Sequence, residues 1–152
     1  MELDAPIEYN AEDSMIFDIP QQKVYLYGKA HVDYDEIVLD ASYIEFDFKS
    51  KVAFARMTFD SLGKPIGKPL FEEDGEAYEM DSIRYNFDSK RGIIYNVRTE
   101  QAEGYLTGQV IKKQANNNIH VSKGCYTTCD LEKPHYYFRL SKAVVIPDDK
   151  II

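Results

Sequence analysis

Four residues in the C-terminal third have side chains that bind zinc, namely His120, Cys125, Cys129 and His135. Thiolate and imidazole groups are the usual ligands of structural zinc ions. However, three residues separate the two cysteines, and the histidines flank them at looser distances than in a zinc finger. We therefore expect no metal here, and the cysteines are either reduced thiols or, in an oxidising compartment, members of a disulfide.

Other catalytic arrangements have little support in the sequence. We find no nucleophile elbow, phosphate-binding loop or metalloprotease helix motif. Carboxylates cluster at Glu72-Glu73-Asp74 and at Asp33, Asp35 and Glu36, but in polar stretches where solvation explains them. We expect a protein that is not an enzyme and has no cofactor, and an enzymatic role would rest on the His/Cys group alone.

Length and charge restrict the class of protein further. The 152 residues, of which 44% are hydrophobic, predict one domain with its own core. Since 18 basic residues face 26 acidic ones, the net charge is −8, which argues against binding to nucleic acid. The stretch 109–142 is nevertheless basic, with six Lys or Arg against two acidic residues. This +4 stretch either meets an anionic ligand or is an ordinary solvated face.

The sequence contains no signal for membrane insertion or export. No apolar run approaches the ~18 residues that a membrane helix needs. The opening residues 1–6 have neither the basic nor the apolar region of a signal peptide. We therefore expect either a cytosolic protein or a piece of a longer one.

Apolar residues alternate with polar ones in several segments, which predicts strands with one buried face. Helical spacing also occurs at Ile37, Ala41, Ile44 and Phe48, but no capping residues bracket a helix there. The apolar stripes form either a closed core or an apolar trough that suits acyl chains. The candidate lining residues are Phe17, Ile19, Ile44, Phe46, Phe48, Ile83, Tyr85, Phe87, Phe138 and Leu140.

An internal repeat supports the strand interpretation. Residues 40–51 match residues 79–90 at a constant offset of 39, and in both copies the apolar phase changes parity midway. Such a change predicts a bulge or kink, where a strand passes from one layer to another. Polar turns are predicted at 49–51 and 88–92, with weaker copies of the repeat at 15–23 and 144–150, and a loop between the halves at 63–69. A sandwich, a roll or a short β-solenoid would fit this pattern.

Several segments resemble one family. Residues 124–138 (GCYTTCDLEKPHYYF) and 142–147 (KAVVIP) resemble the end of the periplasmic domain of LptD (OstA), the outer-membrane lipopolysaccharide-assembly protein. Residues 67–71, 83–87 and 92–97 resemble the form that the family takes in Bacteroidetes-like bacteria. The resemblance extends from about Ala11 to the end of the chain.

This resemblance implies an all-β fold, an OstA-type β-jellyroll of stacked antiparallel strands that is open on one side. Its apolar interior would receive the acyl chains of lipopolysaccharide and pass them to a C-terminal barrel at the periplasmic face of the outer membrane. The implied partners are lipopolysaccharide, a periplasmic bridge protein that pairs by its edge strands, and the chain's own barrel with its lipoprotein plug. Residues 1–152 would then be a single domain excised from a longer chain.

The resemblance leaves the disulfides and two other functions open. The family forms disulfides between this domain and the barrel, and Cys129 occupies the matching position. Cys125 departs from the commoner pattern, so that a local bond between the two cysteines is an alternative. A soluble periplasmic bridge protein of the OstA group would have the same roll without a barrel. A carbohydrate-binding β-sandwich could instead use the twelve tyrosines as stacking platforms.

Overall fold

A computed structural model describes residues 7–73, 75–101, 104–129, 135–146 and 149–152, and their regular structure is β-strand throughout. This confirms the all-β prediction. In the same part of the chain, no helix is long and apolar enough to cross a membrane. The strands are β1 (Ile7–Asn10), β2 (Ser14–Asp18), β3 (Lys23–Tyr34), β4 (Ile37–Asp47), β5 (Val52–Arg56), β6 (Thr58–Phe59), β7 (Pro65–Ile66), β8 (Leu70–Glu73), β9 (Glu76–Glu79), β10 (Ser82–Asn86), β11 (Arg91–Gln101), β12 (Gly104–Lys113), β13 (Ile119–Thr127), β14 (Phe138–Ile146) and β15 (Lys150–Ile151).

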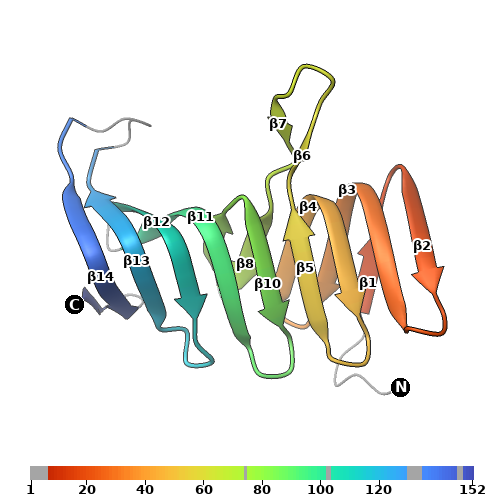
Figure 1. Ribbon diagram of the computed structural model, residues 1–152. Coiled ribbons are helices and arrows are strands. Elements are labelled where there is room, and N and C mark those ends of the chain that lie inside the picture. The colour runs from red at the N-terminus through yellow and green to blue at the C-terminus, as the bar shows by residue number, and fades with distance from the viewer. Residues whose placement is uncertain (1–6, 74, 102–103, 130–134, 147–148) are drawn as a thin grey trace.

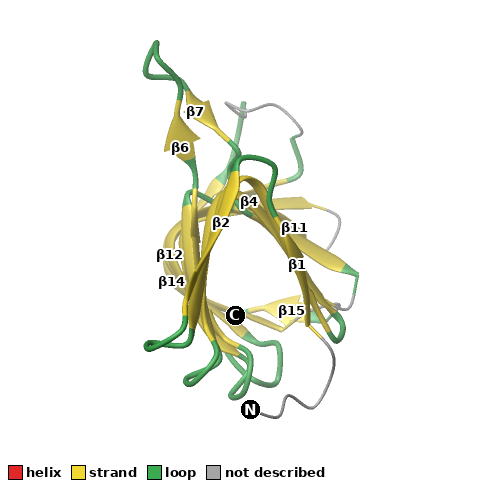
Figure 2. Cartoon of the chain, turned by 90° about the vertical axis from the view of Figure 1, so that its right-hand side faces the viewer, coloured by secondary structure: helices red, strands yellow, loops and turns green. Residues whose placement is uncertain are grey.

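Thirteen strands form one antiparallel sheet that folds over into two layers (Figures 1 and 2). The front layer in Figure 1 includes β2, β5 and β10, and the back layer includes β1, β8 and β9. Long strands pass through both layers: residues 43–47 of β4 pair with β5 in front, whereas residues 37–40 pair with β8 behind. Strands β12, β13 and β14 extend the sheet by pairing with one another after β11. The molecule is therefore a roll whose axis crosses the strands.

The strands change layer where the sequence predicts a change of parity. In β4 the buried residues Leu39 and Ala41 are followed by Ile44 and Phe46, so the inward-facing positions change from odd to even numbers, and the successive residues 43 and 44 are both buried. In the second copy Met80 is buried before the break and Ile83 after it. The predicted kink is thus confirmed in both copies. In β3 the bend coincides with a register shift and with positive φ angles of 76° and 43° at Gly28 and Lys29.

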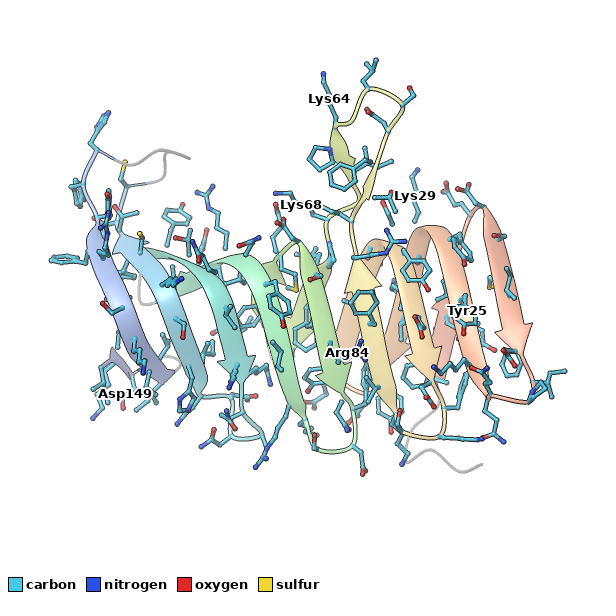
Figure 3. The ribbon with its side chains drawn as sticks, in the orientation of Figure 1. Tyr25, Lys29, Lys64, Lys68, Arg84 and Asp149 are labelled. Carbon is cyan, nitrogen blue, oxygen red and sulfur yellow. The ribbon has the colours of Figure 1, made fainter. Side chains whose placement is uncertain are left out.

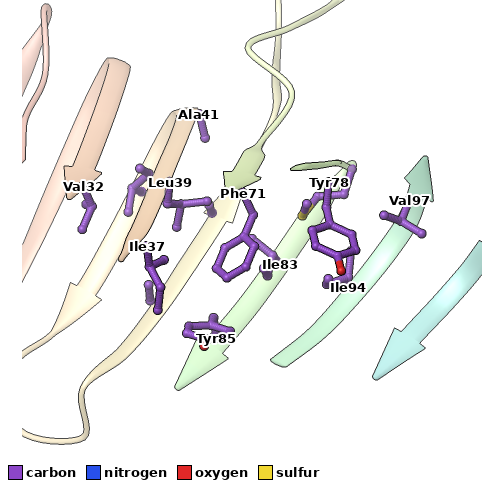
Figure 4. Packing of buried hydrophobic residues seen from close by; sticks show 14 of the residues in the cluster. Val32, Ile37, Leu39, Ala41, Phe71, Tyr78, Ile83, Tyr85, Ile94 and Val97 are labelled. Atoms are coloured by element: carbon purple, nitrogen blue, oxygen red, sulfur yellow. The ribbon is translucent and has the colours of Figure 1, made fainter. Parts of the chain in front are cut away.

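The inner face of the front layer has an apolar row that crosses nine strands in register. Its members are Met15, Leu26, Ile44, Ala55, Ile83, Ile94, Ile111, Val121 and Ala143. Back-layer side chains pack against this face, and the Phe71 ring lies 4.8 Å from the Tyr85 ring (Figure 4). A fully buried side chain of this size stabilises the fold by about 1.5–3 kcal/mol. The core therefore extends along most of the roll.

Polar side chains close the predicted hairpin turns. Asp47 Oδ1 accepts hydrogen bonds from the backbone N–H groups of Lys49 and Ser50, at 2.8 and 3.2 Å. Asn86, 39 residues later, accepts the equivalent bonds at 2.9 and 3.0 Å. Both turns are confirmed, and the internal repeat therefore extends to the residues that terminate the strands.

The loop predicted over 63–69 is in part a second, small sheet. Strands β6 and β7 form a hairpin that projects from the roll between β5 and β8 (Figure 1). Ser42 holds its base, because its N–H donates to Gly67 O at 2.9 Å and its Oγ to Ile66 O at 2.8 Å. The alternation signal is too short here to distinguish a two-residue strand from a loop.

Candidate functional site

Six of the ten candidate lining residues lie together on the inner face of the front layer. Ile44, Phe46 and Phe48 come from β4 and the turn after it, and Ile83, Tyr85 and Phe87 come from the second copy of the repeat. None is more than 7% exposed. The rings of Phe46 and Phe87 lie 5.6 Å apart, which joins the two copies. This middle section of the roll is closed and packed by its own side chains.

At the N-terminal end, the interior reaches the surface. Phe17 in β2 pairs with the inward-facing Val24 and its ring lies 5.7 Å from that of Phe48, yet it is 47% exposed. Met15, two residues earlier, also faces inward and is exposed, because none of the described strands pairs with β2 on its other side. Ile19 follows the end of β2 and is 74% exposed, so the structure does not bring it together with the other candidates.

At the C-terminal end, β14 exposes the interior in a similar way. Phe138 pairs with Tyr126, which in turn pairs with the buried Leu106, and this register places Phe138 on the inner face. Phe138 is nevertheless 69% exposed. Leu140 is half-buried and packs against the core. The apolar interior therefore runs from β2 to β14, covered in the middle and exposed at both ends.

One charged pair lies inside the roll, and the sequence patterns did not predict it. Lys113 Nζ lies 2.7 Å from Glu73 Oε2, and both side chains are buried. Tyr85 OH donates to the same carboxylate oxygen at 3.4 Å, and Lys113 Nζ donates to Asn117 Oδ1 at 3.0 Å. The interpretation of residues 72–74 as solvated is therefore wrong for Glu73, which the pairing of β8 with β4 turns inward; Asp74 lies outside the described residues.

The His/Cys group does not form one site in the structure. His120 is exposed on the front half of β13, whereas Cys125 lies beyond the change of parity in the same strand. Among the described residues, no three His, Cys, Asp or Glu side chains are placed to share a metal ion. Cys125 and Cys129 are both half-buried free thiols, and the proposed disulfide stays a prediction.

Two groups on the outer surface of the front layer have perturbed pKa values. Burial, together with the negative charge and hydrogen bond of Glu45, raises the pKa of Tyr43 to about 12. Desolvation of Asp47 acts to raise its pKa, but the N–H bonds from Ser50 and Lys49 outweigh it and lower the pKa overall. Neither group faces the interior, so neither indicates a proton-transfer site inside the roll.

The fold has a known counterpart among solved structures. It is similar to the crystal structure of LptH, the LptA homologous periplasmic component of the lipopolysaccharide transport device from Pseudomonas aeruginosa. The TM-score is 0.62 over 89% of this chain and 94% of that chain, at 16% sequence identity. The chain has the same β-jellyroll fold. No known protein-family profile and no curated protein sequence matches the chain. Part of the segment with the clearest LptD resemblance, residues 130–134, lies outside the described residues.

Proposed function

We propose that this protein is a non-enzymatic component of lipopolysaccharide transport in the periplasm. One observation carries the proposal: the apolar interior extends across the whole roll and is exposed at both of its ends, on β2 and on β14. The fold shared with LptH and the resemblance to the LptD periplasmic domain support the same role.

Transport would depend on burial of the lipid acyl chains in the interior and would involve no covalent step. Each acyl CH₂ group that leaves water for the interior gains about 0.8 kcal/mol. The middle of the roll is filled by Phe46, Phe87 and their neighbours, so acyl chains enter it only if the two layers separate. The layers are continuous through the kinked strands, and separation would therefore occur on the side away from the kink.

The two ends of the roll would pass the lipid on. Among the described strands, β1 and β2 at one end and β15 at the other pair on one side only, and β15 covers only the last part of β14. A similar roll can pair with such an edge by β-augmentation, which would join two apolar interiors. The partners would be a periplasmic bridge protein and, if the chain continues as in LptD, its own outer-membrane barrel with its lipoprotein plug.

A soluble bridge protein of the OstA group is the second candidate. The LptH structure favours it, because LptH is described as a periplasmic component and the alignment covers 94% of that chain. The coding sequence downstream of Ile152 discriminates the two candidates: a barrel-length continuation supports the LptD-like role, and a stop codon supports the bridge role.

Photo-crosslinking tests the lipid path itself. A photoreactive residue at Phe48 or Phe87 should capture lipopolysaccharide, because both side chains face the interior. Phe54 is the matched control, since it lies on β5 but points outward, opposite Arg84 and Glu45. Labelling confined to Phe54, Glu45 and Asp47 would show that the lipid follows the outer face, and the proposal would fail.

A further inference from the structure

The outer face of the front layer is a second surface of distinct chemistry. Its side chains alternate with the inner row, so they point away from the proposed lipid path. Two rows cross the strands in register, one through Tyr25, Phe54 and Arg84 and the other through Tyr27, Arg56 and Tyr95. We call these two rows the outer aromatic face; Figure 3 shows Tyr25 and Arg84 on it.

This face is basic although the protein is acidic. The two rows contain four Lys or Arg side chains against the single carboxylate of Glu45, so they carry +3 in a chain of net charge −8. The Glu45 carboxylate already has two partners: its Oε1 lies 3.6 Å from Lys23 Nζ, and its Oε2 accepts a hydrogen bond from Tyr43 OH at 3.2 Å. The basic side chains are Arg56, Arg84, Lys112 and Lys142, and all four are exposed.

The N-terminal part of the back layer has the opposite charge on its outer surface. The outward positions of β1, β8, β9 and residues 31–40 of β3 and β4 include five carboxylates, and these described segments place no Lys or Arg among them. The carboxylates are Glu8, Asp33, Asp40, Glu72 and Glu79. These segments of the back layer are therefore acidic where the outer aromatic face is basic, so an anionic ligand is attracted to the outer aromatic face and repelled from this part of the back layer.

Aromatic rings on the outer aromatic face support the guanidinium groups. The Arg56 guanidinium lies 4.7 Å from the Tyr43 ring centroid, and that of Arg84 lies 5.3 Å from the Phe54 centroid. Arg56 also donates to Met57 O at 3.4 Å. Cation–π contact holds a guanidinium in place while its N–H edges stay available for carboxylate or phosphate oxygens. Tyr27 and Tyr95 are the exposed rings beside them, at 37% and 46%.

We propose that the outer aromatic face binds an anionic oligosaccharide. Sugar rings would pack on the exposed Tyr27 and Tyr95, and their carboxylate or phosphate groups would accept hydrogen bonds from Arg56 and Arg84. An extended saccharide that crosses the strands meets a new side chain about every 4.8 Å. A bilayer fits the face less well, because the charged side chains protrude and the Tyr43 ring beneath them is only 8% exposed.

Calorimetric titration with a lipid-free oligogalacturonate tests this proposal, with a neutral maltooligosaccharide of equal length as the reference ligand. We expect the anionic ligand to bind, more weakly as salt is added, and the neutral ligand to bind at least tenfold more weakly. Arg84→Ala and Tyr95→Ala should each weaken binding about fivefold. Arg98→Ala is the matched control, because Arg98 also lies over a ring, 5.0 Å from the Tyr105 centroid, but on the opposite outer face.

Three results would overturn the proposal: no binding of the oligogalacturonate by the folded wild-type chain, equal weakening by Arg98→Ala, or binding to anionic phospholipid vesicles without binding to the saccharide. Circular dichroism of each variant checks that its fold is intact. The ligand has no acyl chains, and capture of lipopolysaccharide at Phe48 should be unchanged in Arg84→Ala. A failure of this site and a failure of the lipid path are therefore distinguishable.

Discussion

Lys113 and Glu73 form an ion pair that links the two layers of the roll from the inside. Lys113 ends β12 and Glu73 ends β8, and their charged atoms lie 2.7 Å apart with side-chain exposures of 2% and 7%. Removing two charges from water costs several kcal/mol per ion, and close contact with additional hydrogen bonds offsets that cost. Here Tyr85 and Asn117 supply those bonds, so the pair is satisfied inside an apolar interior.

Breaking this pair should destabilise the fold strongly. Lys113→Met leaves the Glu73 carboxylate buried without its partner, and we expect the free energy of unfolding to fall by about 3–5 kcal/mol. The double variant Lys113→Met/Glu73→Leu removes both charges and should recover most of that loss. Urea denaturation measures both. If the double variant is as unstable as the single one, packing of the Lys113 stem, and not the charge, accounts for the effect.

The Asp47 turn should weaken in acid, whereas its counterpart should not. Because the folded pKa of Asp47 is lowered, the ionised carboxylate contributes stability above its ordinary pKa of 3.8, and that contribution is lost as pH falls through the lowered value. Asp47→Ala should cost about 1 kcal/mol at neutral pH. The deficit relative to wild type should shrink near pH 3.

Asn86→Ala supplies the control for this measurement. Asn86 makes the same two turn hydrogen bonds through an amide that does not titrate. Its loss of unfolding free energy should be similar at both pH values, and Asp47→Asn should retain most of the wild-type stability. An Asp47→Ala deficit that is independent of pH would contradict the assigned role of the carboxylate.

Tyr43 should titrate well above the ordinary pKa of a tyrosine. Its pKa is raised from 10.0 to about 12, so the folded state favours the neutral phenol; the resulting stability is complete below pH 10 and is lost as pH rises toward 12. Absorbance titration of the phenolate should show a late component that Tyr43→Phe removes. Glu45→Gln should lower this pKa only in part, because burial is the larger cause. An unchanged titration in Glu45→Gln would exclude the Glu45 contribution.

Two glycines of the projecting hairpin should respond differently to alanine. Both have positive φ, +60° at Gly67 and +78° at Gly63, so each substitution should cost roughly 1–2 kcal/mol of backbone strain. A Cβ at Gly67 would also overlap Ser42 Oγ, whereas none of the described atoms lies within 4 Å at Gly63. We expect Gly67→Ala to be more destabilising by about 1–3 kcal/mol in thermal denaturation. If the two variants are equally destabilised, the Ser42 side chain moves away from the new Cβ at no cost in stability.

Local patterns predicted the features that depend on neighbours in the sequence. The change of parity between Ala41 and Ile44 follows from residues in one strand, and Asp47 predicts a turn because aspartate is a common turn residue. Both were predicted correctly. The six inner residues of the two best repeat copies are also buried, as the alternation indicates.

Features that depend on distant partners were not predictable in this way. Glu73 and Lys113 are 40 residues apart and meet only because the sheet folds over, so their local contexts suggested solvated charges. Phe17 and Phe138 are exposed because, among the described strands, β2 and the first half of β14 have a partner on one side only, which alternation does not report. The charge separation between the outer faces likewise appears only when the register of the strands is known.

The repeat of 39 residues corresponds to one circuit of the chain through both layers, from the bend in β4 to the break between β9 and β10. Each circuit adds two strands to the front layer, or roughly 10 Å of axial length. The width of the interior, by contrast, is determined by side chains such as Phe46 and Tyr85 inside a circuit. Duplication of a circuit would therefore lengthen the roll along its axis without changing the width of its interior, so the length and the interior width can evolve independently.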